Sequence, residues 1–390
     1  MIVGGRFHLT YCSNIHAGEA WSDVRDALAS TLPRLRESLQ APGPMGVGLR
    51  LGAEAAGTLA DADELAAFRA FLAEGHYYVF TINGFPYGAF HGRRVKEQVY
   101  QPDWRTDARL AYTNRLAELL AALLEDRPDI DGSVSTVPGA FKADVRGDGD
   151  ASAVASNMLR HVARLVALRL ETGRTITLAI EPEPACFIET IDEAVAFFRD
   201  YLFDDRRATA AGVRVDDVRR HVGLCFDACH MAVEFEDPEQ AFERIQSAGI
   251  RVCKVQVSSA LHIAHPRRPG PRAALARFAD DTYLHQVVTS GTDGLARFTD
   301  LPDALAAPEA ASDCWRVHFH VPVFLPVVGE FETTQSYLSA VLRILAREPI
   351  CPYLEVETYT WDVLPPEHRT SDMVTAIARE LAWVKAQVER

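Results

Sequence analysis

The sequence predicts an α/β protein built as a single (β/α)8 TIM barrel over residues 1–390. Short runs of β-branched and apolar residues alternate with longer segments in which leucine and alanine recur every three or four residues. This alternation predicts parallel strands that are each followed by a helix. Eight strands are expected, and side chains with carboxylate or amide oxygens follow the last four of them. The length of 390 residues is within the range of barrels of this class.

Each expected strand is a short run between segments with helical periodicity. The expected strands are RFHLTY from Arg6, VGLRL from Val47, YYVFTIN from Tyr77, GSVSTV from Gly132, TITLAIE from Thr175, HVGLCFD from His221, RVCKVQV from Arg251 and YLEVET from Tyr353. Two clear helices are expected at residues 107–126 and 155–173, and the second ends on Gly173, a residue favoured directly after a helix. A terminal helix over residues 372–390 then covers the bottom or outside of the barrel.

The regular alternation is interrupted after the seventh strand, where residues 258–331 form an insertion. Within it, TYLHQVVTSG and CWRVHFHVPVF predict two short strands of an added hairpin. Long loops of this kind are usually functional, and in such barrels they lie at the C-terminal face. An alternative interpretation makes RVHFHV a ninth strand of a differently organised sheet. The insertion contains five of the thirteen histidines, namely His262, His265, His285, His318 and His320.

Composition and charge exclude some classes of function. The formal net charge of −14 argues against binding to a nucleic-acid backbone, which requires a dense basic surface. The seven cysteines are scattered without a CxxC pair, and the opening MIVGGRFHLTYCSN lacks the basic start and long apolar core of a signal peptide. No apolar run is long enough to cross a membrane. We therefore expect a cytoplasmic protein with free thiols that does not bind nucleic acid and does not insert into membranes.

The ends of the last four strands carry oxygen ligands at matching depth. They are Glu181 in AIEPEP, Asp227 in FDACH, Gln256 in KVQVSS and Glu357 in EVETYT, and His230 follows Asp227 by three residues. In a barrel these positions converge near the axis, and three carboxylates brought together repel one another unless they bind a proton or a cation. A divalent cation is the simplest solution. Carboxylate and amide oxygens suit Mg²⁺ or Mn²⁺, and nearby histidines extend the range to Zn²⁺, Fe²⁺ or Co²⁺.

A zinc–thiolate site is the alternative for VGLCFDACH, since Cys225 and Cys229 flank Asp227. Structural zinc would need two more sulfur or nitrogen ligands at short spacing, and the sequence does not supply them. Cys225 shares its strand face with Asp227 one layer deeper, where a cysteine usually packs as a small apolar residue. The stretch therefore reads as an Asp-x-x-His motif.

The segments GLCFDACH, AIEPEP, KVQVSS and LEVET resemble the xylose-isomerase-like barrel superfamily, which includes sugar isomerases, epimerases and the endonuclease IV family. The resemblance implies Glu181, Asp227, Gln256 and Glu357 as metal ligands, with Gln256 where histidine is usual. It implies that His230 contacts substrate or a second metal, and it places His262 where epimerases have a substrate-binding arginine.

This sequence departs from the epimerases at Phe187, where they carry a second carboxylate that takes part in proton transfer. Glu183 or Glu189 is the expected substitute. The histidines of the second and third strands in the endonuclease site are also missing, which argues against DNA repair.

A closer resemblance covers nearly the whole chain. FHLTYCSNIHAGEAW, YVFTINGFPYGAFHG and VHFHVPVF look like the EboE-type metabolite traffic proteins of the same superfamily. This resemblance implies a role in making or moving a secondary metabolite. It allows an association with other proteins of the pathway, and an oligomer.

Local motifs add candidate substrate-binding residues. HLTYCSNIH is expected to place His8, Asn14 and His16 near the barrel mouth, and TINGFPYGAFHG adds Asn83. The same residues could equally be ordinary hydrogen-bonding or packing groups of loops.

His318 and His320 alternate in RVHFHV, so both are expected on one face of a strand. Next to a metal site, either histidine could add a ligand or a base. We expect His320 as a further metal ligand and His318 as a substrate-binding residue, and the resemblance to the family favours His320 nearer the substrate. Trp361 is expected either to form a wall of the pocket or to pack in the core.

The leading hypothesis is a metal-dependent isomerase or epimerase that acts on a polyhydroxylated or carbonyl-bearing small molecule. Glu181 or Glu357 would act as the base, and His230 and His262 would orient hydroxyl groups or transfer protons. One alternative is a metal-dependent hydrolase or phosphodiesterase with a two-metal site. Another is a barrel that binds a metabolite without catalysis, since the fold alone does not determine function.

Overall fold

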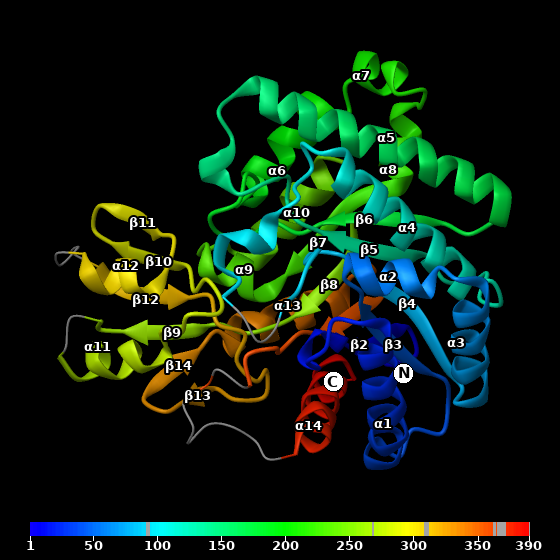
Figure 1. Ribbon diagram of the computed structural model, residues 1–390. Helices are drawn as coiled ribbons and strands as arrows, with labels where there is room; N and C mark the ends of the chain where they lie inside the picture. Colours follow the sequence, from blue (N-terminus) through cyan, green and yellow to red (C-terminus); the bar gives the residue numbers. More distant parts are fainter. Residues whose placement is uncertain (91–93, 267–268, 308–311, 362–363, 365–371, 390) are drawn as a thin grey trace.

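The computed structural model describes residues 1–90, 94–266, 269–307, 312–361, 364 and 372–389. Eight parallel strands form the predicted barrel and follow one another around it in chain order (Figure 1). The barrel closes between its first and second strands, where Cys12 and Gly48 form a parallel bridge. The barrel strands are β2 (Phe7–Tyr11), β3 (Met45–Arg50), β4 (Tyr77–Asn83), β5 (Gly132–Thr136), β6 (Ile176–Ile180), β7 (Val222–Asp227), β8 (Arg251–Val257) and β15 (Tyr353–Val356).

All eight expected strands are present, and their bounds agree with the sequence prediction to within two residues. The prediction succeeds because strands buried on both faces are continuous apolar runs, and most of these strands are buried at every position. A short additional strand, β1 (Ile2–Val3), pairs antiparallel with β2. The (β/α)8 barrel is therefore confirmed.

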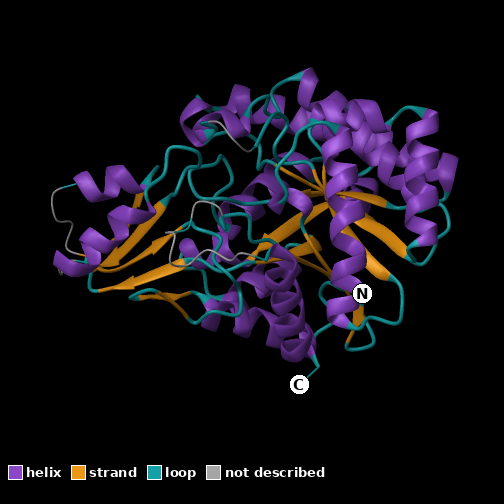
Figure 2. Cartoon of the chain, turned by 60° about the horizontal axis from the view of Figure 1, so that its bottom comes forward, coloured by secondary structure: helices purple, strands orange, loops and turns teal. Residues whose placement is uncertain are grey.

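Helices surround the barrel, and α1 and α14 pack against each other near the chain termini (Figures 1 and 2). α5 ends at Thr172, and the next residue, Gly173, has a φ of 71°, as expected directly after a helix. No helix among the described residues is long and apolar enough to span a membrane. The helices are α1 (Trp21–Leu39), α2 (Ala53–Leu59), α3 (Ala62–Glu74), α4 (Asp107–Leu123), α5 (Asp148–Thr172), α6 (Ile191–Phe197), α7 (Asp205–Ala210), α8 (Val215–His221), α9 (Ala228–Val233), α10 (Pro238–Ser247), α13 (Gln335–Arg347) and α14 (Met373–Val388), with the short turns η1 (Ser13–Ile15), η2 (Lys96–Tyr100), η3 (Lys142–Asp144) and η4 (Phe198–Leu202).

The insertion between β8 and α13 forms a second, six-stranded sheet that projects to one side of the barrel (Figures 1 and 2). Its strand order is β11-β10-β12-β9-β14-β13, and all of its pairs are antiparallel. Its elements are β9 (Leu261–Ala264), α11 (Pro269–Leu275), η5 (Ala276–Phe278), β10 (Val287–Gly291), β11 (Gly294–Phe298), α12 (Leu301–Ala306), β12 (Ser312–Val317), β13 (Val327–Val328) and β14 (Phe331–Thr333).

This second sheet corrects the expectation of a simple hairpin. The two expected strands exist as β10 and β12 and pair antiparallel, but β10 forms its hairpin with β11. β12 ends at Val317, so His318 and His320 follow the strand instead of alternating within it. The strands β9, β11, β13 and β14 are short, and their pairing depends on distant partners, which is why a periodicity argument does not find them.

Candidate metal centre

Three carboxylate side chains meet at the C-terminal mouth of the barrel. Glu181 directly follows β6, Asp227 ends β7 and Glu357 follows β15. One oxygen from each lies within 4.8 Å of the others. The three residues are 3%, 0% and 4% exposed, respectively, so water does little to screen their mutual repulsion.

The buried carboxylates of this cluster repel one another unless they bind a proton or a cation. Burial raises the pKa of Glu181 to about 8. The pKa of Glu357 lies well above its usual value because of burial and of repulsion by Glu181 and Asp227. Glu181 Oε2 and Asp227 Oδ2 are buried without a hydrogen-bond partner among the described residues. Carboxylate oxygens in this state are suitable ligands for a hard divalent cation.

Neighbouring donors hold the other oxygens of two of these carboxylates. Asn14 and Asn83 donate side-chain hydrogen bonds to Glu357 Oε1 at 2.7 and 2.9 Å. The Ser258 hydroxyl donates to Asp227 Oδ1 at 2.8 Å. Each of these carboxylates is therefore fixed in direction by one oxygen, while its second oxygen remains for another ligand. Asn14 and Asn83, expected as substrate-binding residues, line the cavity above the cluster.

Gln256 lies beside the carboxylates in β8. It pairs in register with Asp227 on one side and Glu355 on the other, and it is fully buried. Its amide faces Glu355, whose pKa it lowers, and its amide oxygen lacks a hydrogen-bond partner in the described part of the chain. A buried amide oxygen without a partner costs free energy unless it gains a ligand, so Gln256 fits the oxygen-ligand set.

Three histidines approach the same place with their Nε2 atoms available as ligands. In each, Nδ1 faces an oxygen acceptor, which fixes the proton on Nδ1 and leaves the lone pair on Nε2. The distances are 3.0 Å from His230 Nδ1 to the Pro182 carbonyl, 2.6 Å from His318 Nδ1 to Gln286 Oε1 and 2.9 Å from His320 Nδ1 to the Glu357 carbonyl.

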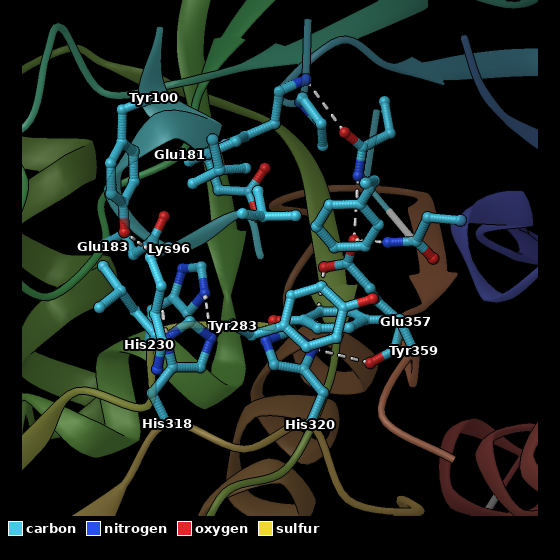
Figure 3. Close-up of a pocket in the computed structure, with 18 residues that line it drawn as sticks. Lys96, Tyr100, Glu181, Glu183, His230, Tyr283, His318, His320, Glu357 and Tyr359 are labelled. Atoms are coloured by element: carbon cyan, nitrogen blue, oxygen red, sulfur yellow. Dashed lines mark hydrogen bonds and ion pairs between the residues drawn. The ribbon is translucent and has the colours of Figure 1, made fainter. Parts of the chain in front are cut away.

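The positions of the Nε2 atoms also fit metal coordination. His230 Nε2 and His318 Nε2 are 3.2 Å apart. Two nitrogens bound at ordinary zinc–nitrogen lengths in a tetrahedral site lie about 3.3 Å from each other. His320 Nε2 has no hydrogen-bond partner among the described residues and lies 4.0 Å from Asp227 Oδ2. Figure 3 shows His318 and His320 approaching from the insertion, opposite Glu181.

The charge states of the three histidines differ. Burial lowers the pKa of His320 to about 4, and burial together with the neighbouring histidines places the pKa of His318 well below its usual value. Both rings are therefore neutral near pH 7, as metal ligands must be. Burial also opposes protonation of His230, but the carboxylates of Asp227, Glu183 and Glu181 outweigh it and raise its pKa.

Glu183 is the second carboxylate on the β6 side of the cavity. Its Oε1 accepts hydrogen bonds from the Tyr100 hydroxyl at 2.8 Å and from Gln286 Nε2 at 3.1 Å. Burial raises its pKa. Glu189, the other candidate from the sequence, instead forms an ion pair with Lys142 and does not line the cavity. Of the two, Glu183 is therefore the residue that lines the cavity, and no feature of the sequence distinguishes it from Glu189.

One layer below, the barrel interior contains a buried ion pair between Lys254 and Glu355. Burial raises the pKa of Glu355, and Lys254 and Gln256 oppose this effect. The side chain of Glu355 occupies space that only a glycine at position 48 leaves free. A Cβ on Gly48 would lie 1.8 Å from Glu355 Oε1 and 2.6 Å from the Tyr11 carbonyl. Neither Lys254 nor Glu355 is among the residues predicted from the sequence.

Two expected site residues lie elsewhere. His8 is the second residue of β2, at the N-terminal end of the barrel, where its Nδ1 lies 3.0 Å from the Tyr78 hydroxyl. His8 does not reach the barrel mouth because its motif begins inside the strand and does not follow it. His262 lies in β9 of the second sheet, opposite Arg316 and Glu332. The chain turns away from the barrel after β8, so spacing from Gln256 does not bring His262 to the mouth.

Two further candidates do not line the cavity. His16 Nε2 lies 2.9 Å from the Tyr11 hydroxyl, and the two rings are edge to face. Trp361 is 5% exposed and packs in the main hydrophobic core, which is the second of its two expected roles. Glu181, Glu357, His230, His318 and His320 do line the cavity, and Asp227 and Gln256 lie buried beneath it.

The chain shares its fold with proteins of known structure. No protein-family model matches the sequence, and no curated protein matches it either. A xylose isomerase-like TIM barrel protein from Mycobacterium smegmatis, solved in complex with magnesium, matches at a TM-score of 0.50 with 14% identity over 100% of this chain and 99% of that chain. The fold is therefore that of the xylose-isomerase-like TIM barrels.

Two further matches are weaker. IolI with a bound zinc atom matches at a TM-score of 0.49 with 14% identity over 98% of each chain. The probable 3-DHS dehydratase AsbF of petrobactin synthesis from Bacillus anthracis matches at 0.49 with 11% identity over 96% of this chain and 97% of that chain.

Proposed function

We propose that this protein is a metal-dependent enzyme that isomerises or epimerises a polyhydroxylated or carbonyl-bearing small molecule. The observation that carries the proposal is the cluster of three buried carboxylates with ligand atoms within 4.8 Å of one another. Two of their oxygens have no hydrogen-bond partner among the described residues. A divalent cation would satisfy both the repulsion and the unpaired oxygens.

The residues that would hold the cation are Glu181, Asp227, Gln256 and Glu357, with His320 in reach of Asp227. When bound, a divalent cation would stabilise negative charge that develops on substrate oxygens. The ligand set is compatible with Mn²⁺, Mg²⁺, Zn²⁺, Fe²⁺ or Co²⁺. The magnesium in the similar Mycobacterium smegmatis structure agrees with this range.

Proton transfer would fall to side chains on two sides of the cavity. Glu183 lies in the cavity wall outside the carboxylate cluster, and burial raises its pKa, which favours the protonated form relative to an exposed carboxyl group. The Tyr100 hydroxyl orients it through Oε1. Glu181 would be the base on the metal side, where a nearby cation would lower its pKa. His230, in the protonated form that its raised pKa favours, would donate a hydrogen bond from Nε2 to a substrate hydroxyl. Asn14 and Asn83 hold Glu357 in place.

The test is metal analysis by mass spectrometry after loading the purified protein with Mn²⁺ and removing free ion. We expect about one equivalent in the wild type and in the control Glu330→Ala, which removes an exposed carboxylate from the insertion. Glu181→Ala and Asp227→Ala should lose the ion while keeping their far-ultraviolet circular dichroism. If the wild type binds no metal, or if both variants keep it, the proposal fails and a metabolite-binding barrel without catalysis becomes the better hypothesis.

A second candidate function is hydrolysis at a two-metal site. The three Nε2 atoms of His230, His318 and His320, two of them 3.2 Å apart, favour it because they supply nitrogen ligands beside the carboxylates. The same metal analysis separates the two functions, since two equivalents per chain would favour hydrolysis.

The pathway is also part of the proposal. The EboE-type resemblance of the sequence supports a place in the biosynthesis or traffic of a secondary metabolite, with other proteins of that pathway or a second copy of the chain as partners. A cytoplasmic location is supported by the seven cysteines, all of which are free. Co-purification with the products of neighbouring genes would test the partners.

A further inference from the structure

The cavity above the metal centre has two chemically different ends. The inner end is formed by the carboxylates and histidines, and the outer wall is apolar and aromatic (Figure 3). The outer wall comes from the chain after β4, from η2, from the insertion and from the chain after β15. The residues that define it are Phe85, Phe90, Val99, Tyr283, Leu284 and Tyr359.

The aromatic part of this wall begins next to the candidate ligands. The ring of Tyr359 lies 4.7 Å from the ring of His320. Phe90 and Tyr283 pack on Tyr359 and on each other, with ring centroids 5.0 to 5.4 Å apart. These three rings come from three separate segments of the chain and form one continuous surface. A group attached to a molecule held by the carboxylates would therefore lie against aromatic rings.

The only lysine or arginine in the described cavity lining is Lys96, and its charge is already compensated. Its Nζ forms an ion pair with Asp300 Oδ2 at 2.6 Å and donates to the Asp280 carbonyl at 2.9 Å. The inner end carries Glu181, Glu183 and Glu357. Recognition of a phosphate or carboxylate normally uses an available guanidinium or ammonium group, and the residues that the structure describes in this wall offer none.

We propose that the substrate is an uncharged molecule with an oxygen-rich head and an apolar, preferably aromatic, substituent. The proposal rests on the proposed function, because the head is the part that the carboxylate site would hold. Bare sugars and polyols would leave the aromatic wall exposed to water, and sugar phosphates would place a negative charge against it. Burial of an apolar substituent is favourable in proportion to the area removed from water.

The test compares three molecules that share one diol head: glycerol, glycerol phenyl ether and glycerol 3-phosphate. Binding is measured by saturation-transfer difference NMR on the full-length protein in the presence of Mg²⁺. We expect the phenyl ether to bind at least about tenfold more tightly than glycerol, and glycerol 3-phosphate to bind no more tightly than glycerol. Equal affinities of glycerol and its phenyl ether, or tighter binding of the phosphate, would overturn the proposal.

Variants of the outer wall test whether the preference for glycerol phenyl ether over glycerol arises in this cavity. Leu284→Asn and the milder Val99→Asn should reduce the advantage of the phenyl ether by about threefold or more. Val327→Asn is the matched control, because Val327 is 49% exposed on the second sheet and does not line the cavity. An undiminished advantage in both wall variants would show that the phenyl group binds elsewhere and would refute the assignment.

The two proposals can fail separately. If Mn²⁺ analysis shows the metal site while the phenyl ether has no advantage, the substrate class is wrong and the proposed function stands. If the phenyl ether is preferred in a manner that depends on Val99 and Leu284, while no metal binds, the proposed function fails and the apolar wall remains a binding surface.

Discussion

The barrel and the insertion supply opposite halves of the site in different ways. The barrel contributes Glu181, Asp227 and Glu357, whose positions follow from strand register. The insertion contributes His318 and His320, which lie beyond the end of β12. Parallel strands in a closed barrel bring their carboxyl ends together whatever the loops do. The histidines, in contrast, depend on side-chain hydrogen bonds such as that between His318 and Gln286.

This comparison predicts that substitutions in the barrel lower the free energy of unfolding most, whereas substitutions in the insertion weaken metal binding by the histidines. The largest effect is expected for Lys254→Met, which leaves the fully buried carboxylate of Glu355 without its partner. Breaking a buried ion pair in this way costs about 3–5 kcal/mol of the free energy of unfolding. Urea denaturation measures the loss. Lys385→Met, an exposed lysine of α14, is the control and should change stability little.

The double variant Lys254→Met/Glu355→Met removes both charges and should recover much of that loss, since replacement of a buried pair by apolar residues is often neutral. If Lys254→Met is no more destabilising than Lys385→Met, the ion pair does not stabilise the barrel. The prediction that the barrel dominates stability would then be wrong.

A smaller effect is expected where the two regions meet. Glu380 of α14 accepts hydrogen bonds from the Thr358 hydroxyl at 2.6 Å and from the Val323 amide of the insertion at 3.1 Å. Burial raises its pKa to about 7. A carboxyl with a raised pKa stabilises the folded state while it is protonated. This stability is complete below the unfolded pKa near 4.5 and is lost as the pH rises to about 7, by up to about 3 kcal/mol.

Glu380→Gln should therefore flatten the dependence of the unfolding free energy on pH between 4.5 and 7, measured by urea denaturation at several pH values. Glu389→Gln, at an exposed position near the end of the chain, is the control. An unchanged slope in Glu380→Gln would mean that this carboxyl does not couple the helix to the insertion.

The smallest effect is expected for Gln286→Leu, which removes the acceptor for His318 Nδ1. Loss of such a contact to a metal-binding histidine typically weakens metal affinity by 10- to 100-fold, about 1.4–2.7 kcal/mol. Calorimetry with Zn²⁺ should show weaker binding of the histidine ligands and an unchanged carboxylate site. Gln98→Leu, at an exposed position of η2, is the control. If Gln286→Leu weakens Zn²⁺ binding equally at the histidines and at the carboxylates, the two groups of ligands are not independent.

The difference between the barrel and the insertion also explains which features could be predicted from the sequence. All eight barrel strands and the four positions at their ends were predictable, because apolar runs and strand ends are local features. Glu183 could only be narrowed to a pair with Glu189, since the choice depends on Tyr100 and Gln286, which are distant in sequence. The second sheet was underestimated because its short strands pair with distant partners.

The outer wall of the cavity also could not be predicted from the sequence. Phe90, Tyr283 and Tyr359 belong to separate segments, and nothing in their local sequence shows that their rings meet. His8 and His262 were misplaced for a related reason. Their positions were inferred from spacing to a motif, whereas strand register carries His8 to the far end of the barrel and places His262 in another sheet.

The close approach of Gly48 to Glu355 has a consequence for the evolution of this barrel. Any side chain at position 48 would overlap the Glu355 carboxylate. A relative with a larger residue at position 48 should therefore carry a smaller residue at position 355. Without the carboxylate at 355, Lys254 would be a buried charge without its partner. The three positions should covary across homologous sequences as a single unit, in which the glycine changes only together with the ion pair.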